Sequence, residues 1–207
     1  MGELDQLLSA PASLVLLALN IGLSFAAFQN AALMDRLMFD VSRIRRNKEW
    51  YRWVSSGFVH GDPFHLLINM MTLYAFGPTL EAWLGTSAFL GIYFGSLLAG
   101  SAWTWMEHFR DVNYRAVGAS GAISGLVSVF AMFAPVAMLI FPPVPVILYS
   151  LGFILWSAWA ASNNVRDGIG HSAHLGGALA GVAIVCIWWP YIPQRMVDQI
   201  VAAVTGF

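Results

Sequence analysis

The sequence predicts an all-α membrane protein built as a bundle of six transmembrane helices. Of its 207 residues, 58% are hydrophobic and only 10% are charged, whereas a typical soluble domain has about 25% charged residues. Six apolar runs approach the roughly 20 residues that a helix needs to cross the hydrocarbon core. They are too long and alternate too little to be barrel strands. The runs cover residues 11–32, 64–84, 87–106, 118–135, 144–162 and 172–190.

Helix-breaking residues mark where the predicted spans begin and end. Asp62-Pro63 precedes the second run, Gly85 separates the second from the third, and prolines at positions 135–145 interrupt the link between the fourth and fifth. Proline and glycine both disfavour the helix interior. Six spans put both termini on the same side of the membrane. The N-terminal segment lacks the positive charges of a signal peptide, so we interpret the first run as a retained span of a single domain over residues 1–207.

Composition also narrows the class of partner. The formal net charge is −1 and no basic cluster is interleaved with aromatic residues, so no nucleic-acid partner is expected. Cys186 is the only cysteine, which excludes a disulfide within the chain. Residues 33–62 place arginines and a lysine beside the aromatic residues at 50–53, a pattern typical of a loop in the lipid headgroup layer. The tail 194–207 has apolar residues at helical spacing and predicts a short surface helix.

Polar residues recur at the starts of the second, fourth and sixth runs, where burial in lipid is costly and needs a reason. His65-x-x-x-Asn69 places two polar side chains on one helix face. Gly118 and Ser120 open the fourth run, and His174 lies near the start of the sixth. These three runs cross the membrane in the same direction, so their starts are expected on one side and at similar depth.

Glycine spacing predicts that the fourth and sixth spans touch. Small residues four apart let membrane helices pack backbone to backbone. Two such faces occur, one in each run: Gly121-x-x-x-Gly125 and Gly177-x-x-x-Gly181. Ser120 and His174 each lie just before one of these faces. Close packing there brings the two side chains within reach of each other.

The residue types at these positions suit nucleophilic catalysis. A serine hydroxyl needs a base to take its proton, and histidine, with an ordinary pKa of about 6.5, is the usual base near neutral pH. Attack on a carbonyl creates an oxyanion that needs preset donors. His65 and Asn69 supply side-chain donors, and Ser120 supplies its backbone N–H. No carboxylate lies inside a span near this face, so the expected unit is a Ser/His dyad without metal or cofactor.

Each group also has a purely structural interpretation. A serine between glycines is common in packed membrane helices, a lone intramembrane histidine often makes a structural hydrogen bond, and His-x-x-x-Asn can tie two helices together. All three groups are expected at the same depth in the membrane, which favours a shared catalytic role over three independent structural roles. The remaining histidines are interpreted as loop or interface residues: His60, His108 and His171.

Taken together, the motifs resemble those of the rhomboid family of intramembrane serine proteases. The resemblance covers about residues 50–190 and rests on Arg52 in the first loop and on three segments in the same order and spacing. These are FHLLINM at 64–70, GASGAISGL at 118–126 and AHLGGALAG at 173–181. It implies the six-helix rhomboid-like bundle, with a first loop embedded in the membrane interface as a structural element.

The resemblance also implies the chemistry of the site. Ser120 is then the nucleophile, His174 the base, and His65 and Asn69 part of the oxyanion hole. The substrates are expected to be single-span membrane proteins cut near the interface, with the lipid bilayer as the other partner and the fifth span as the gate. The oligomeric state stays open. Two positions depart from the commoner family pattern: Tyr51 stands where tryptophan often precedes the loop arginine, and Ser124 stands where an aromatic residue often supports the catalytic histidine ring.

Two other functions compete with proteolysis. A catalytically silent relative of the family would bind and escort membrane segments, although both dyad residues are present. A metal-binding membrane protein would use His65, His171 and His174, but the chain has no His-Glu-x-x-His motif and no intramembrane carboxylate near them. Labelling with a serine-reactive fluorophosphonate separates the protease from both alternatives.

Two arguments disagree about orientation in the membrane. The positive-inside rule assigns the basic side to the cytoplasm. The first, third and fifth links hold nine of the ten basic residues, and the opposite side holds only Arg195. The resemblance to a bacterial plasma-membrane rhomboid implies the opposite orientation, with the active site outside and both termini inside. We favour the latter because basic residues embedded in the headgroup layer are not the free loops on which the rule rests.

Overall fold

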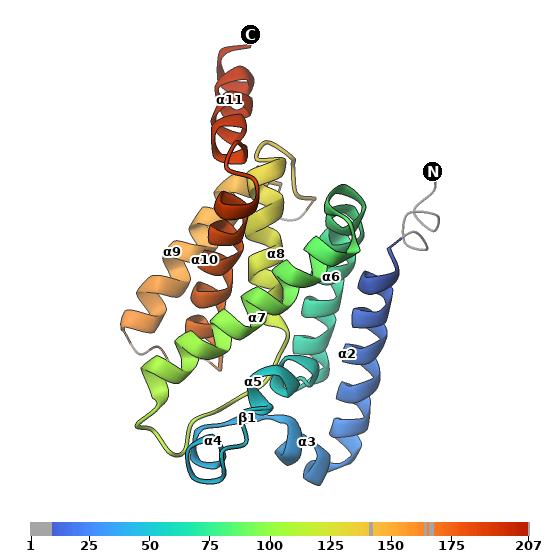
Figure 1. Cartoon of the computed structure of the whole chain (residues 1–207), viewed down its shortest axis with the longest axis vertical. Coiled ribbons are helices and arrows are strands. Elements are labelled where there is room, and N and C mark those ends of the chain that lie inside the picture. The colour runs from blue at the N-terminus through green and yellow to red at the C-terminus, as the bar shows by residue number, and fades with distance from the viewer. Residues whose placement is uncertain (1–9, 141–142, 164, 166–167, 207) are drawn as a thin grey trace.

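The computed structural model describes residues 10–140, 143–163, 165 and 168–206 of the chain, and these residues are mostly helical. Six long helices lie where the six apolar runs predicted them (Figure 1). Smaller elements, including the 3-10 helix η1, form the first loop, the link into α8 and the C-terminal tail. The long helices are α2 (Pro11–Gln29), α6 (Pro63–Leu84), α7 (Thr86–His108), α8 (Ser120–Phe133), α9 (Val146–Ser162) and α10 (His171–Trp188); the smaller elements are α3 (Ala31–Leu37), β1 (Phe39–Asp40), α4 (Val41–Asn47), α5 (Arg52–Ser55), η1 (Ser56–Phe58), β2 (Arg115–Ala116) and α11 (Ile192–Thr205).

Not all of these helices have the length of a membrane span. By length and composition, α2 and α10 are long and apolar enough to cross a membrane by themselves, and α8 and α9 are shorter apolar helices. The predicted fourth span, 118–135, is helical only over the 14 residues of α8, a length of about 21 Å against a hydrocarbon core of about 30 Å. The chain enters the bundle as a coil before α8 begins (Figure 1). Ser120 therefore lies inside the bundle.

Helix α10 packs between α7 and α8 by close backbone contact. A side chain at Gly177 would lie 2.0 Å from the carbonyl oxygen of Gly121, and one at Gly181 would lie 2.6 Å from that of Gly125. On the other flank, a side chain at Gly100 of α7 would lie 2.7 Å from the carbonyl oxygen of Ala173. Only glycine permits these approaches. The glycine spacing predicted the contact of α10 with α8, whereas the contact with α7 at Gly100 was not predicted. The start of α10 is thereby held against the start of α8.

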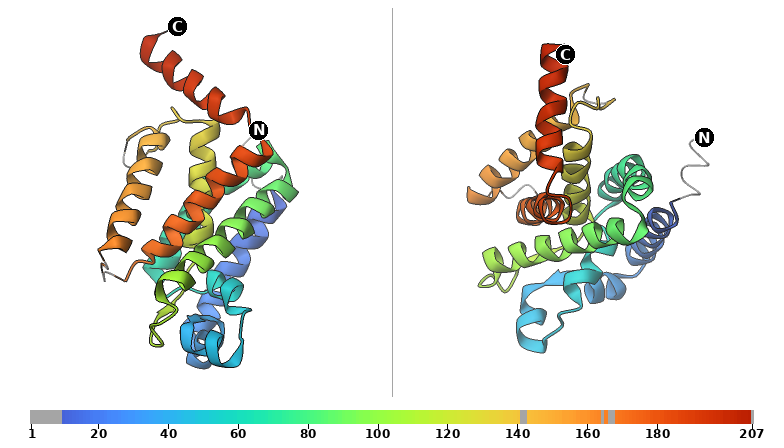
Figure 2. Two further views of the ribbon diagram at one scale, coloured as in Figure 1. Left: turned by 60° about the vertical axis from the view of Figure 1, so that its left-hand side comes forward. Right: turned by 45° about the horizontal axis from the view of Figure 1, so that its top comes forward.

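The first loop folds into a compact unit at one end of the bundle (Figure 2). Its centre is the fully buried side chain of Arg52. This guanidinium pairs with Glu49 at 2.6 Å and donates to the backbone carbonyls of Asp35 and Met38 at 2.8 and 2.7 Å. Strand β1 of the loop pairs with β2, so Phe39 lies opposite Ala116. The loop is thus joined to the segment that leads into α8.

A buried carboxylate stabilises the opposite end of the bundle. Glu81, near the end of α6, accepts hydrogen bonds from the first-turn backbone amides of Ala12 and Ser13 in α2, at 3.0 and 2.8 Å. It also accepts from the hydroxyl of Thr86 at the start of α7. A negative charge at a helix N-terminus satisfies unpaired amides and the helix dipole. This carboxylate joins three helices far from the face that carries Ser120.

Helix α11 extends beyond the end of the bundle at which α10 ends (Figures 1 and 2). It confirms the helix expected in the C-terminal tail. Its apolar side leaves Val197, Val201 and Val204 exposed, while Gln199 donates to the carbonyl of Phe133 at the end of α8. Ile192 is buried in the core and Met196 packs against it, so the first half of α11 is attached to the bundle while its apolar end is exposed.

Candidate active site

Ser120 occupies the first position of α8, directly after a tight turn. Gly118 has a φ of +123°, a conformation that only glycine adopts readily. The N–H groups of Gly118 and Ala119 are engaged, with the carbonyl of Ser56 at 2.9 Å and with His60 Nε2 at 3.4 Å. The amides of Ser120 and the residues after it lie in the first helical turn, where no intrahelical carbonyl is available. This terminus presents free donors beside the serine hydroxyl, as anion-binding helix ends do.

His65 lies against the same turn. A side chain at Gly118 would lie 2.6 Å from His65 Cε1 and 2.8 Å from His65 Nε2, so the imidazole fits only beside glycine. The helix that carries it is capped by Asp62, which accepts from the backbone N–H of His65 at 2.9 Å. The imidazole therefore lies against Gly118, which precedes Ser120 by two residues in the chain.

Asn69 is buried one turn further along α6 on the same face. Its side-chain nitrogen donates to the carbonyl of His65 at 3.2 Å. An amide nitrogen has two hydrogens, so a second donor stays available. The i, i+4 spacing places Asn69 and His65 on one face of α6, and His65 on that face lies against Gly118.

His174 is buried in the first turn of α10, and its ring contacts an aromatic residue of α9. The centroids of the Phe153 and His174 rings are 5.1 Å apart with an interplanar angle of 35°. The ring of His171 lies 6.2 Å from that of His174, edge to face. Because Gly121 packs against the backbone of Ala173, His174 is one residue from the direct contact between α8 and α10.

The side chain at position 124 of α8 is small, which leaves room for an aromatic residue of α9 to reach His174. Ser124 is buried and donates to the carbonyl of Ser120 at 2.7 Å. One turn further along α8, Ser128 meets Ser150 of α9 at 3.3 Å. Because α9 runs back along α8, the next turn of α9 brings Phe153 to the level of Ser124. The ring that the sequence lacks at position 124 is supplied from α9.

His60 contributes more than its interpretation as a loop histidine suggested. It is fully buried, its Nδ1 lies 2.9 Å from the hydroxyl of Ser24, and its Nε2 accepts from the backbone N–H of Ala119. Its ring packs edge to face on that of His65 at 5.1 Å. Burial lowers the pKa of His60 to about 4, so the imidazole is neutral near pH 7. His60 therefore links α2 to the residue before Ser120.

A small cavity adjoins Ser120 on the side of α7 and the first loop. Its volume is about 40 Å³, enough for a water molecule. Ser56, Ser101, Thr104 and Ser120 are among its lining residues, together with apolar residues such as Phe39 and Leu97. A small space with some polar residues in its wall therefore lies next to the serine. Among the residues that the structure describes, no group of three His, Cys, Asp or Glu side chains is arranged to hold a metal ion.

The structure brings some of the sequence-predicted residues near one another and adds two neighbours that the sequence did not predict. His65 lies against the Gly118 turn that leads to Ser120, Asn69 follows one turn along α6, and the helix with His174 contacts α8 through glycines. The missed residues are His60 and Phe153. The only sequence signals for them are weak: His60 lies five residues before His65, and Phe153 stands in an apolar helix without polar neighbours.

The chain belongs to the rhomboid family. Residues 47–191, well over half of the chain, match the model of the Rhomboid domain. The resemblance found in the sequence motifs is thus confirmed, and with it the rhomboid fold, a bundle of six transmembrane helices, in a multi-pass membrane protein.

Several curated proteins are similar to the chain. It is 40% identical over 84 residues to the putative rhomboid protease YdcA of Bacillus subtilis, covering 41% of each chain. It is 35% identical to the mitochondrial rhomboid protein 1 of Saccharomyces cerevisiae, over 62% of this chain and 39% of the relative. It is 26% identical to the rhomboid protease AarA of Providencia stuartii, over 89% of this chain and 74% of the relative. The chain thus spans about two fifths of the first two relatives.

Proposed function

We propose that this protein is an intramembrane serine endopeptidase that cleaves membrane proteins with a Ser120/His174 dyad. The observation that carries the proposal is the position of Ser120: it opens a short helix inside the bundle, and glycine contacts hold the start of α10 against it. A silent relative or a packing serine has no need for a free helix N-terminus beside polar side chains from α6. Proteolysis uses each of these features.

The proposed reaction begins with attack of the Ser120 hydroxyl on the scissile carbonyl, while His174 takes the hydroxyl proton. The resulting oxyanion is bound by the first-turn amide of Ser120 and by donors from His65 and Asn69, groups oriented before the charge develops. His174 then gives its proton to the leaving amine. An acyl-enzyme on Ser120 remains.

Water completes the cycle. The small cavity beside Ser120 is the proposed place for this water, since bulk water does not reach the interior of a membrane bundle freely. His174 takes a proton from this water, the water oxygen attacks the acyl carbonyl, and Ser120 leaves with the proton returned by His174. The products are two peptide segments.

The proposed substrates are single-span membrane proteins whose helix unwinds near the membrane interface. A regular helix hides its carbonyls in intrahelical hydrogen bonds, so a locally extended segment is needed for attack by Ser120. We further propose the plasma membrane of a bacterium as the location, with the catalytic side outward.

The test is Ser120→Ala and His174→Ala in the full chain, assayed on a single-span substrate in proteoliposomes. Each change is expected to abolish cleavage and the labelling of Ser120 by a fluorophosphonate, while expression stays near normal. The two losses should be similar, because a nucleophile and its base act as a unit. Cleavage at the normal rate by Ser120→Ala would exclude the proposed mechanism.

A further inference from the structure

Some basic residues in and beside the first loop are paired with carboxylates, and others are not. Arg43 pairs with Asp35, Arg52 with Glu49, and Arg115 with Asp40. Arg45 and Arg46 have no carboxylate partner among the described residues. Exposed Arg36 and Lys48 form no ion pair there either, but Arg45 and Arg46 are adjacent on helix α4 and concentrate positive charge on it.

Helix α4 holds those two arginines on one face. Ser42, Arg45 and Arg46 follow the i, i+3, i+4 spacing of a single helical face. The adjacent face is anchored: Val41 and Ile44 are fully buried in a cluster with Phe39 and neighbouring aromatic residues. The cationic face is therefore oriented by packing behind it.

A cavity of about 220 Å³ lies at this face, lined by Ser42, Arg45, Arg46 and Val112. Nη1 of Arg45 is fixed by a hydrogen bond to the carbonyl of Phe109 at 2.9 Å. Two guanidinium groups and one hydroxyl line the cavity, and no acidic residue does. Such a site favours an anion, and the planar forks of arginine match phosphate oxygens in particular.

Nearby acidic residues are engaged elsewhere. Asp111 accepts from the backbone N–H of Asn113 within its own loop. Glu107, at the end of α7, accepts from the hydroxyl of Ser172 at 2.6 Å. Neither carboxylate lines the cavity.

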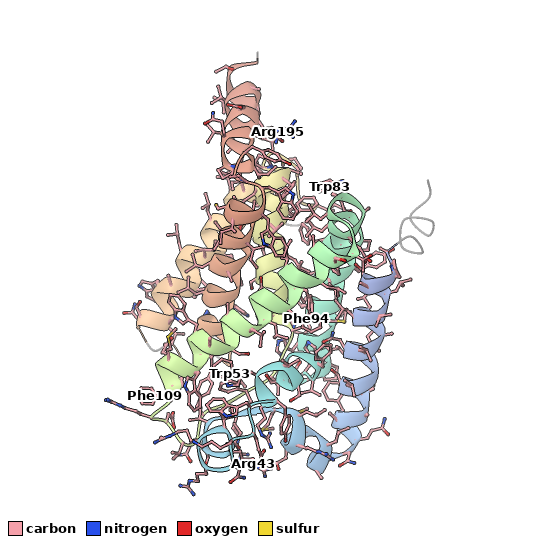
Figure 3. The ribbon with its side chains drawn as sticks, in the orientation of Figure 1. Arg43, Trp53, Trp83, Phe94, Phe109 and Arg195 are labelled. Atoms are coloured by element: carbon pink, nitrogen blue, oxygen red, sulfur yellow. The ribbon has the colours of Figure 1, made fainter. Side chains whose placement is uncertain are left out.

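Exposed apolar side chains on the same loop and helix end favour a position of the cavity at the level of the lipid headgroups. Trp50 and Phe109 are exposed around the loop, and Met106 in the last turn of α7 is 63% exposed. Exposed aromatic residues at a helix end are typical of the membrane interface. Figure 3 shows Phe109 and Arg43 at one end of the bundle and Arg195 at the other. At this level, an arginine-lined cavity would face the phosphate groups of the lipids, and the exposed apolar residues beside it would face their acyl chains.

We propose that the cavity between α4 and the loop after α7 binds the phosphate of an anionic phospholipid. The guanidinium groups of Arg45 and Arg46 hold the phosphate oxygens, Ser42 donates a further hydrogen bond, and the acyl chains lie along the exposed apolar residues. A basic pocket at the bilayer surface is a known way to select such headgroups. This site is separate from the proteolytic residues and does not rest on the proposed activity.

The test is native mass spectrometry of the full chain in nonionic detergent, titrated with phosphatidylglycerol or with phosphatidylcholine of the same acyl chains. One phosphatidylglycerol is expected to bind in preference to phosphatidylcholine. Arg45→Gln/Arg46→Gln should weaken that binding about tenfold or more, from the loss of two cations near the phosphate. The matched control, Arg36→Gln/Lys48→Gln, removes the same charge from exposed positions of the same loop outside the cavity and should bind as the unmodified chain does.

Two further variants keep the result interpretable. Arg46→Glu leaves the Arg45 hydrogen bond to Phe109 intact and should lose the lipid at least as strongly as the double variant. Ser120→Ala should bind it normally, which separates this site from the proteolytic one. If Arg45→Gln/Arg46→Gln and Arg36→Gln/Lys48→Gln lose phosphatidylglycerol binding equally, the lipid is attracted by the general charge of the loop and the proposed site is wrong. Displacement of the lipid by millimolar inorganic phosphate would overturn the lipid as its ligand.

Discussion

Replacing Phe153 by alanine tests whether α9 orients the proposed base. The ring of Phe153 lies 5.1 Å from that of His174, within the range of about 4.5–7 Å in which aromatic pairs attract. Such contacts contribute about 0.5–1.5 kcal/mol beyond area burial. If that energy holds the imidazole in its reactive orientation, turnover should fall about two- to tenfold. Substrate affinity should change little, because the ring touches the base.

A second substitution, Ser124→Tyr, tests whether the side chains at positions 124 and 153 compete for the same space beside His174. Ser124→Tyr alone should reduce turnover, because a ring beside the close contact at Gly125 overfills the interface at a cost of about 1–3 kcal/mol. In a Phe153→Ala background, the tyrosine ring has the space that Phe153 leaves. The double variant should therefore be more active than Ser124→Tyr alone, with a coupling of about 1 kcal/mol or more.

The assay is steady-state cleavage of a single-span substrate in proteoliposomes, together with the rate of fluorophosphonate labelling at Ser120. Leu155→Ala is the matched control, because this residue lies on the same helix and is exposed. It should leave both rates unchanged. Thermal midpoints of all variants check that the bundle is intact. Additive losses from Phe153→Ala and Ser124→Tyr, or a gain in turnover from Ser124→Tyr alone, would refute the shared-space argument.

Three further predictions concern the oxyanion site, the buried imidazole and the orientation. Asn69→Ala should lower turnover by less than the 10²–10³ that is roughly typical of one oxyanion donor, since other donors remain; weaker substrate binding with intact turnover would make Asn69 a structural tie. Neutral His60, with its pKa lowered by burial to about 4 from 6.5, contributes at most about 3 kcal/mol of stability. This contribution is complete above pH 6.5 and is lost as pH falls toward 4, so the thermal midpoint should fall over that window and fall less in His60→Phe. Single cysteines at Asn47 and Ala203, in a Cys186→Ala background, should show labelling of intact cells by an impermeant thiol reagent at 47 only; labelling at 203 with protection at 47 would place the catalytic side in the cytoplasm.

The charges of the first loop bear on the orientation test. Three of the nine basic residues on the catalytic side are paired with carboxylates: Arg43, Arg52 and Arg115. Arg52, moreover, is fully buried and hydrogen-bonded to backbone carbonyls of the loop. These side chains serve the folding of the loop. The excess of basic residues is therefore weaker evidence for a cytoplasmic location than the count alone suggests, and the cysteine experiment decides the matter.

The sequence by itself determined the fold class, the six helices and the polar residues of the candidate site. Apolar runs of span length leave the backbone only the helix as a way to satisfy its hydrogen bonds in lipid. Glycines four apart likewise predicted the contact between α8 and α10. These inferences are local: each depends on residues close together in the chain. Polar side chains inside such runs are costly to bury in lipid, so their presence indicates the residues of a functional site.

Only the tertiary structure decided how deep Ser120 lies, which ring supports His174, and what His60 does. The start of α8 is set by the turn at Gly118, which fits against a side chain of another helix. Phe153 and His60 act through contacts with residues that are distant in sequence, His174 and Ala119. No spacing rule encodes such contacts, because they depend on how whole helices are placed against one another. An apolar ring or a loop histidine acquires its role only from the neighbours that this packing supplies.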